Sequence, residues 1–191
     1  MGRFLRAAVG LLLGVLLLTL TTVAIGQQIG SNTPDGIRRW SDRQSVTRRL
    51  LRGENHVCPL AEPLPTPPFS IEVTARLSSF SATTTLWGVL LNVDSALPGA
   101  VLFSPDRHFY PPGDDTAHFS TALHPGGQFN RIRLTVSADQ QASLAINGEV
   151  VWQGPYHFDN NHNQWALFAA NSDPKPAVIA WLSVVLITPP D

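Results

Sequence analysis

The chain has 191 residues, of which 43% are hydrophobic and 14% are charged, and its formal net charge is -1. This composition excludes a disordered chain and gives no support to binding of nucleic acid, which needs an excess of positive charge. Arginine greatly outnumbers lysine, which occurs once, at Lys175, and this bias is typical of GC-rich bacterial genomes.

The N-terminal residues 1–26 predict a membrane segment. Arg3 and Arg6 precede an uncharged run from Ala7 to Ile25, which is long enough to cross a hydrocarbon core of about 30 Å as a helix. We therefore expect a signal anchor, which makes this a single-pass protein of the cell membrane with its domain on the extracytoplasmic side. The small residues at positions 24–26 leave open a cleaved signal peptide, in which case the domain is secreted.

Residues 27–68 predict a linker, because they are polar and arginine-rich and end in a proline-rich stretch. Such a stretch is stiff and extended, so it would serve as a spacer between membrane and domain. The only cysteine, Cys58, lies in this segment, so the chain can form no internal disulfide. A disulfide that joins the Cys58 residues of two copies stays open, and so does an idle thiol.

From Phe69 onward, apolar and polar residues alternate with the period of a β-strand. Turns that contain glycine and proline separate the strand-like runs, and no segment has a helical period of useful length. Residues 69–191 therefore predict an all-β domain, an antiparallel two-sheet β-sandwich or jelly roll. Trp87 and Trp181 lie in runs that are apolar on both faces, so we expect both in the core. The runs are Phe69 to Ser79, Thr83 to Val93, Ala100 to Phe103, His118 to Leu123, Phe129 to Ser137, the hairpin at 142–155, Trp165 to Ala170 and Ala177 to Thr188.

The Asn-Gly pair at residues 147–148 predicts a type I′ turn and fixes the register of the hairpin. In this register Ser143 lies opposite Trp152, on the face turned away from the core. The preceding strand places Arg131 and Arg133 on the same face. Because sugar rings stack on tryptophan and sugar hydroxyls bond to arginine, Trp152, Arg131 and Arg133 are predicted to bind a ligand. A core position for Trp152 is the alternative.

The stretch FNRIRL at 129–134 and the stretch SLAINGE at 143–149 resemble the pattern W-N-x-(ILV)-x-(ILV) followed by (ILV)-x-(ILV)-N-G of concanavalin A-like sandwiches. Laminin-G-like and keto-disaccharide hydrolase-like domains are examples, and Phe129 stands where tryptophan is commoner. The resemblance implies two curved antiparallel sheets. It also implies a sugar or protein ligand on the concave face in many members, and in some a calcium ion at its rim.

Catalytic residues are harder to find. Glycoside hydrolysis needs two carboxylates held about 5 to 9.5 Å apart. Glu72 is alone on its strand, Glu149 lies at a turn, and the other acids of the domain lie in loops. A G-x-S-x-G elbow is absent, and the cysteine lies in the predicted linker. We therefore expect no catalytic residue, while a sugar-active hydrolase stays open as an alternative.

A calcium site is suggested weakly by oxygen-bearing side chains in two loops. The candidates are Asp114, Asp115, Asp159 and Asn161, although aspartate and asparagine also serve simply to make turns. No other cofactor is indicated. The sequence thus predicts a membrane-tethered, extracytoplasmic binding module for a glycan or a partner protein. A hydrolase of the same fold and a structural module of the envelope that binds nothing are the alternatives.

Overall fold

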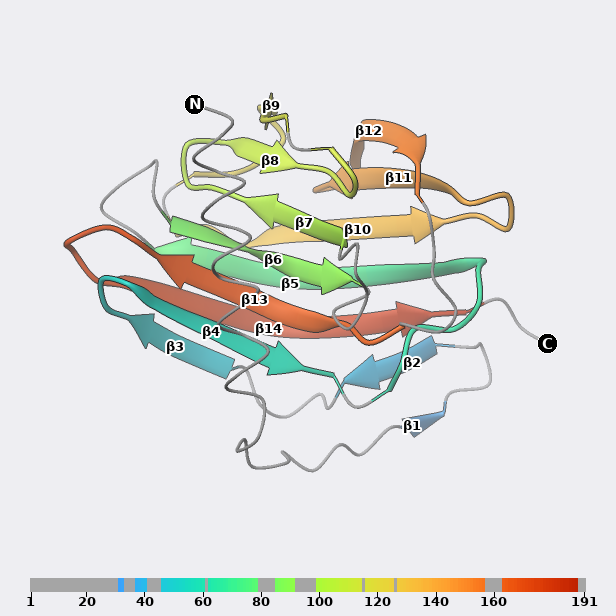
Figure 1. Cartoon of the computed structure of the whole chain (residues 1–191), viewed down its shortest axis with the longest axis horizontal. Coiled ribbons are helices and arrows are strands. Elements are labelled where there is room, and N and C mark those ends of the chain that lie inside the picture. The colour runs from blue at the N-terminus through green and yellow to red at the C-terminus, as the bar shows by residue number, and fades with distance from the viewer. Residues whose placement is uncertain are drawn as a thin grey trace.

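The computed structural model describes residues 31–32, 37–40, 46–60, 62–78, 85–91, 99–114, 116–125, 127–156 and 163–188. Every regular element in these ranges is a strand, and the strands form two antiparallel sheets, one lying over the other (Figure 1). The predicted all-β two-sheet sandwich is confirmed. No helix in the described ranges is long and apolar enough to cross a membrane. The predicted membrane segment 1–26 lies outside these ranges.

The larger sheet has eight strands in the order β1-β2-β14-β5-β10-β11-β12, and β3 also pairs with β14. Its strand β5 buries every second side chain, as the sequence pattern predicts. The opposite face of the same strand meets solvent and carries polar residues. The bounds are β1 Ser31–Asn32, β2 Ile37–Trp40, β3 Val46–Leu50, β5 Phe69–Ser78, β10 Asn130–Val136, β11 Gln141–Ile146, β12 Glu149–Pro155 and β14 Ala177–Ile187.

The smaller sheet has six strands in the order β4-β13-β6-β7-β8-β9. Strand β13 lies between β4 and β6 and is buried along its whole length except at Ala170. A strand that is covered on both faces reads as a continuous apolar run, which is why its sequence shows no alternation. The bounds are β4 Glu54–Pro59, β6 Thr85–Leu91, β7 Gly99–Phe103, β8 His108–Tyr110, β9 His118–Phe119 and β13 Ala166–Asn171.

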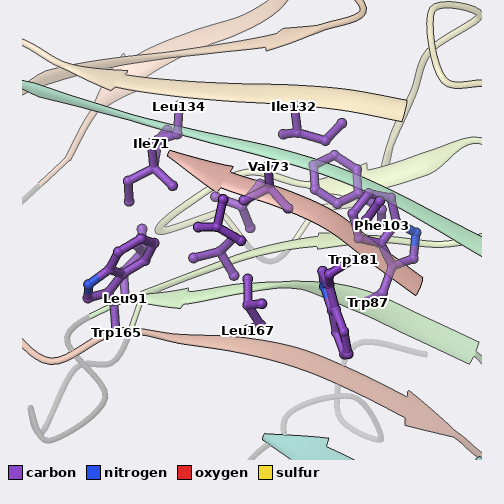
Figure 2. Packing of buried hydrophobic residues seen from close by; sticks show 14 of the residues in the cluster. Ile71, Val73, Trp87, Leu91, Phe103, Ile132, Leu134, Trp165, Leu167 and Trp181 are labelled. Carbon is purple, nitrogen blue, oxygen red and sulfur yellow. The ribbon is translucent and has the colours of Figure 1, made fainter. Parts of the chain in front are cut away.

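The core lies between the two sheets. Figure 2 shows side chains of β5 and β10 in the larger sheet together with side chains of the smaller sheet. Trp87 is 3% exposed and Trp181 is 0% exposed, so the prediction that both lie in the core is confirmed. The residues labelled in Figure 2 are Ile71, Val73, Trp87, Leu91, Phe103, Ile132, Leu134, Trp165, Leu167 and Trp181.

The segment predicted as a linker contributes strands to both sheets. Strand β3 pairs with β14 of the larger sheet, and β4 pairs with β13 of the smaller sheet. Leu50, Leu60 and Leu64, which lie within or after these strands, are at most 3% exposed and belong to the core. The chain before Phe69 therefore supplies edge strands and core side chains to the sandwich.

Candidate ligand-binding face

A strip of polar and aromatic side chains follows β5 and β10 on the outer face of the larger sheet. On β10, Ile132 and Leu134 point into the core, so the residues between them point outward. The antiparallel register places Arg133 opposite Glu72 and Arg131 opposite Thr74. We call this set the arginine strip. Its members are Ser70, Glu72, Thr74 and Arg76 from β5 and Phe129, Arg131, Arg133 and Thr135 from β10 and the residue before it.

Glu72 holds the two arginines of the strip side by side. Arg131 Nε lies 2.8 Å from Glu72 Oε1, and Arg133 Nε lies 3.2 Å from Glu72 Oε2. The Glu72 side chain is only 12% exposed, whereas those of Arg131 and Arg133 are 62% and 47% exposed. The hydrogen bond to Glu72 raises the pKa of the Arg131 guanidinium above its ordinary value, so the group stays charged. The carboxylate thus lies beneath two solvent-facing guanidinium groups.

An aromatic ring lies at one end of the strip and a hydroxyl pair at the other. The guanidinium carbon of Arg76 lies 5.0 Å from the ring centroid of Phe129, a cation–π contact. Phe129 remains 40% exposed. Two strand positions beyond Glu72, Ser70 Oγ and Thr135 Oγ1 are hydrogen-bonded at 2.9 Å. The strip therefore combines an accessible ring, guanidinium donors and hydroxyl groups on one surface.

Trp152 does not join this strip, because β12 is bulged. Ala145 lies opposite Val150 as predicted, but Leu144 lies opposite Trp152, and the register shifts between these two pairs. A bulge adds one residue to one strand, so the side chains that follow it change faces relative to a regular ladder. The predicted pairing of Ser143 with Trp152 is therefore wrong.

The bulge turns Trp152 toward the core side of the sheet. The ring is partly buried and packs against the hydrophobic core, on the face of the fully buried Leu144. It also lies over the backbone of Gly154, where an added Cβ would be only 2.5 Å from Trp152 Cζ2. The structure therefore brings Arg131 and Arg133 together and leaves Trp152 on the opposite face.

Sequence reasoning assigned no binding role to Phe129 and Glu72. Phe129 precedes Arg131 by two residues, so the strand period already places both on one face. Glu72 shows the same period on β5, but only the pairing of β5 with β10 reveals that it meets both arginines.

Of the suggested calcium ligands, the structure describes Asp114 alone; Asp115, Asp159 and Asn161 lie outside the described residues. Asp114 Oδ1 accepts a hydrogen bond of 2.8 Å from the Thr116 N–H, and Oδ2 lies 2.9 Å from His118 Nε2. The bond with His118 lowers the pKa of the Asp114 carboxyl. Within the described ranges, no group of three or more His, Cys, Asp or Glu side chains could hold a metal ion.

No protein-family model matches the sequence, and no curated protein matches it. Solved structures do resemble the fold. The carbohydrate recognition domain of Emp46p in its metal-free form has a TM-score of 0.55 at 13% identity, over 80% of this chain and 82% of that one. A native glycosidic hydrolase has a TM-score of 0.52 at 11% identity, over 84% of this chain and 80% of that one.

The structure of CB05 from A. japonicus has a TM-score of 0.57 at 12% identity over 82% of this chain, but this match spans only 27% of CB05. Identities this low show the fold alone. The fold is a concanavalin A-like sandwich, and the resemblance predicted from the sequence is confirmed.

Proposed function

We propose that this chain is a binding module that holds a carbohydrate on the arginine strip. The observation that carries the proposal is the pair of exposed guanidinium groups fixed by Glu72, next to the accessible ring of Phe129. Two of the similar structures are a carbohydrate recognition domain and a glycosidic hydrolase, which supports a ligand of this class.

The chemistry of the strip suits a sugar. An aromatic ring offers a flat apolar surface to the C–H face of a pyranose, while arginine donates several hydrogen bonds in a fixed planar arrangement. Because Glu72 already positions Arg131 and Arg133, little side-chain entropy is lost when these residues meet a ligand. A strip that runs along two paired strands can accommodate an extended chain of sugars.

Binding is favoured over hydrolysis, because the strip offers a single carboxylate. A glycosidase needs two carboxylates across the scissile bond, and Glu72 is the one acid among the strip residues. Its oxygens are engaged by two arginines, which suits a positioning role. A hydrolase remains the second reading. It predicts that the wild type releases sugar products from a polysaccharide and that Glu72→Gln or Glu149→Gln abolishes this release.

A glycan array tests the proposal. Arg131→Ala and Phe129→Ala are expected to lose the signal of the wild type. Trp152→Ala is expected to keep it, since that ring lies on the opposite face. Circular dichroism checks that each variant is folded. Loss of signal in Trp152→Ala alone would move the site to the face of the bulge. Absence of any glycan signal for the wild type would favour the structural envelope module.

The membrane anchor and the Cys58 dimer remain predictions. Anchoring on the extracytoplasmic side predicts that the protein fractionates with membranes and is digested by protease added outside intact cells. Cys58 is half-buried against the core in β4, and burial raises the pKa of its thiol. A disulfide-linked dimer predicts a band of twice the mass on a non-reducing gel that Cys58→Ser removes.

A further inference from the structure

We propose that the ligand of the arginine strip is an acidic polysaccharide, one whose sugars carry carboxylate groups. This inference rests on the proposed function and names its substrate class. It comes from the charge and the hydrogen-bond geometry of the strip residues.

The first step is the charge of the strip. Arg76, Arg131 and Arg133 supply three guanidinium groups, whereas Glu72 supplies one carboxylate, so the strip carries an excess of two positive charges. The chain as a whole has a net charge of -1. The strip is therefore positively charged although the chain as a whole is slightly negative, and a surface of this kind attracts anions.

The second step is the set of hydrogen-bond donors left for a ligand. A guanidinium group has five N–H donors, and the closest contacts of Arg131 and Arg133 with Glu72 run through Nε. The terminal nitrogens at the exposed ends of both side chains can thus meet a ligand. Two parallel bonds from these nitrogens match the two oxygens of a carboxylate.

The third step is that the pair already accommodates a carboxylate. Glu72 reaches both guanidinium groups at hydrogen-bond distance, one oxygen to each. A second carboxylate on the solvent side would balance the positive charge that Glu72 leaves uncompensated. The Phe129 ring and the hydroxyls of Ser70 and Thr135 lie along the same strip and suit the neutral parts of a sugar chain.

The test compares a charged ligand with its neutral methyl ester. Isothermal titration calorimetry would measure the affinity of the full chain for polygalacturonate oligosaccharides and for the same oligosaccharides fully methyl-esterified. We expect the acid form to bind at least about tenfold more tightly, because each carboxylate can form charge-assisted hydrogen bonds that the ester cannot. We also expect its affinity to fall as sodium chloride is raised, since exposed charges are screened.

Variants locate the effect on the strip. Arg131→Gln and Arg133→Gln are each expected to weaken binding of the acid form about tenfold or more, with little effect on the ester. Arg52→Gln removes the same charge from an exposed turn between β3 and β4, and it should leave both affinities unchanged. Circular dichroism and urea unfolding confirm that the variants are folded.

The outcomes separate the two proposals. Equal, salt-independent binding of acid and ester overturns the acidic ligand and leaves the carbohydrate module standing, as does an array that shows only neutral glycans. Arginine-dependent binding of dextran sulfate that equals that of polygalacturonate overturns the preference for carboxylates. If no glycan binds the wild type at all, the proposed function itself fails.

Discussion

The side chains of Asn130 and Asn147 are joined by a hydrogen bond of 3.0 Å, donated by Asn147 Nδ2 to Asn130 Oδ1. Asn147 Nδ2 also lies 2.7 Å from the carbonyl oxygen of Ala122, and Asn147 Oδ1 accepts a 2.8 Å bond from the Arg131 N–H. The turn residue of the β11–β12 hairpin is thus tied to the first residues of β10. This contact fixes the backbone from which Arg131 projects.

Asn130→Ala is expected to lower the free energy of unfolding by about 2 to 4 kcal/mol. Asn130 is 4% exposed, and its Oδ1 also accepts a bond of 2.7 Å from the His124 N–H. Removal of the amide leaves the His124 N–H and the Asn147 amide without this acceptor at a partly buried position. Urea denaturation measures the change. Asn55→Ala, at an exposed position of β4, is the matched control and should cost about 0.5 kcal/mol or less.

Gly88→Ala is expected to destabilise the protein by about 3 kcal/mol or to prevent folding. A Cβ on Gly88 in β6 would lie 1.9 Å from the carbonyl oxygen of Val101 in the neighbouring strand, and a paired backbone cannot move away cheaply. Gly99→Ala serves as the comparison, since its nearest neighbour would be a ring atom of Tyr156 at 3.3 Å. Its cost should be about 1 kcal/mol or less. Similar unfolding midpoints for the two variants would contradict this account.

Strands that bury one face and expose the other to solvent could be predicted well from the sequence. In β5 and β10 the alternation of apolar and polar residues is nearly unbroken, because one face packs on the core and the other meets solvent. The same alternation placed Phe129, Arg131 and Arg133 on one face. The ion pairs of Glu72 with Arg131 and Arg133 could not be predicted in this way, since they depend on which strand lies beside β10.

Two other features escaped prediction for local reasons. Among the side chains of β3 that the structure describes, 47–50, Leu50 alone is buried, so the segment looks like a solvated linker. An edge strand of this kind is recognised only by its partner β14. The bulge in β12 is a backbone irregularity that strand alternation does not encode. The glycine two residues after Trp152 is the one local sign of it, since it makes room for the ring.

A chain that begins at Phe69 is expected to be unstable and to aggregate. This shorter chain lacks β4, so the edge of β13 is left unpaired. An exposed apolar edge can pair with other chains. The core also loses Leu50, Leu60 and Leu64, whose burial is worth about 2 kcal/mol each. Size-exclusion chromatography and urea unfolding compare it with a chain that begins at Gln27. A monomeric, equally stable short chain would show that the first four strands are dispensable.

Because of His56, the free energy of unfolding is expected to decrease at pH values below about 6.5, which is the ordinary pKa of histidine. Its ring lies in β4 with its centroid 5.8 Å from that of Trp181. Burial, and after it the charge of Arg48, lowers the pKa of His56 in the folded protein. Between that lowered pKa and about 6.5, the unfolded chain binds more protons than the folded one, so the free energy of unfolding decreases as the pH falls through this window.

His56→Gln removes the titrating group and should flatten this part of the pH profile. Urea unfolding at pH 7.5 and pH 5.5 measures the free energy of unfolding for both proteins; the wild type should lose more of it on acidification than the variant. Cys58, two residues away on the same strand, stays protonated across this range, because burial raises the pKa of its thiol. Equal losses in wild type and variant would mean that the acid sensitivity comes from another group.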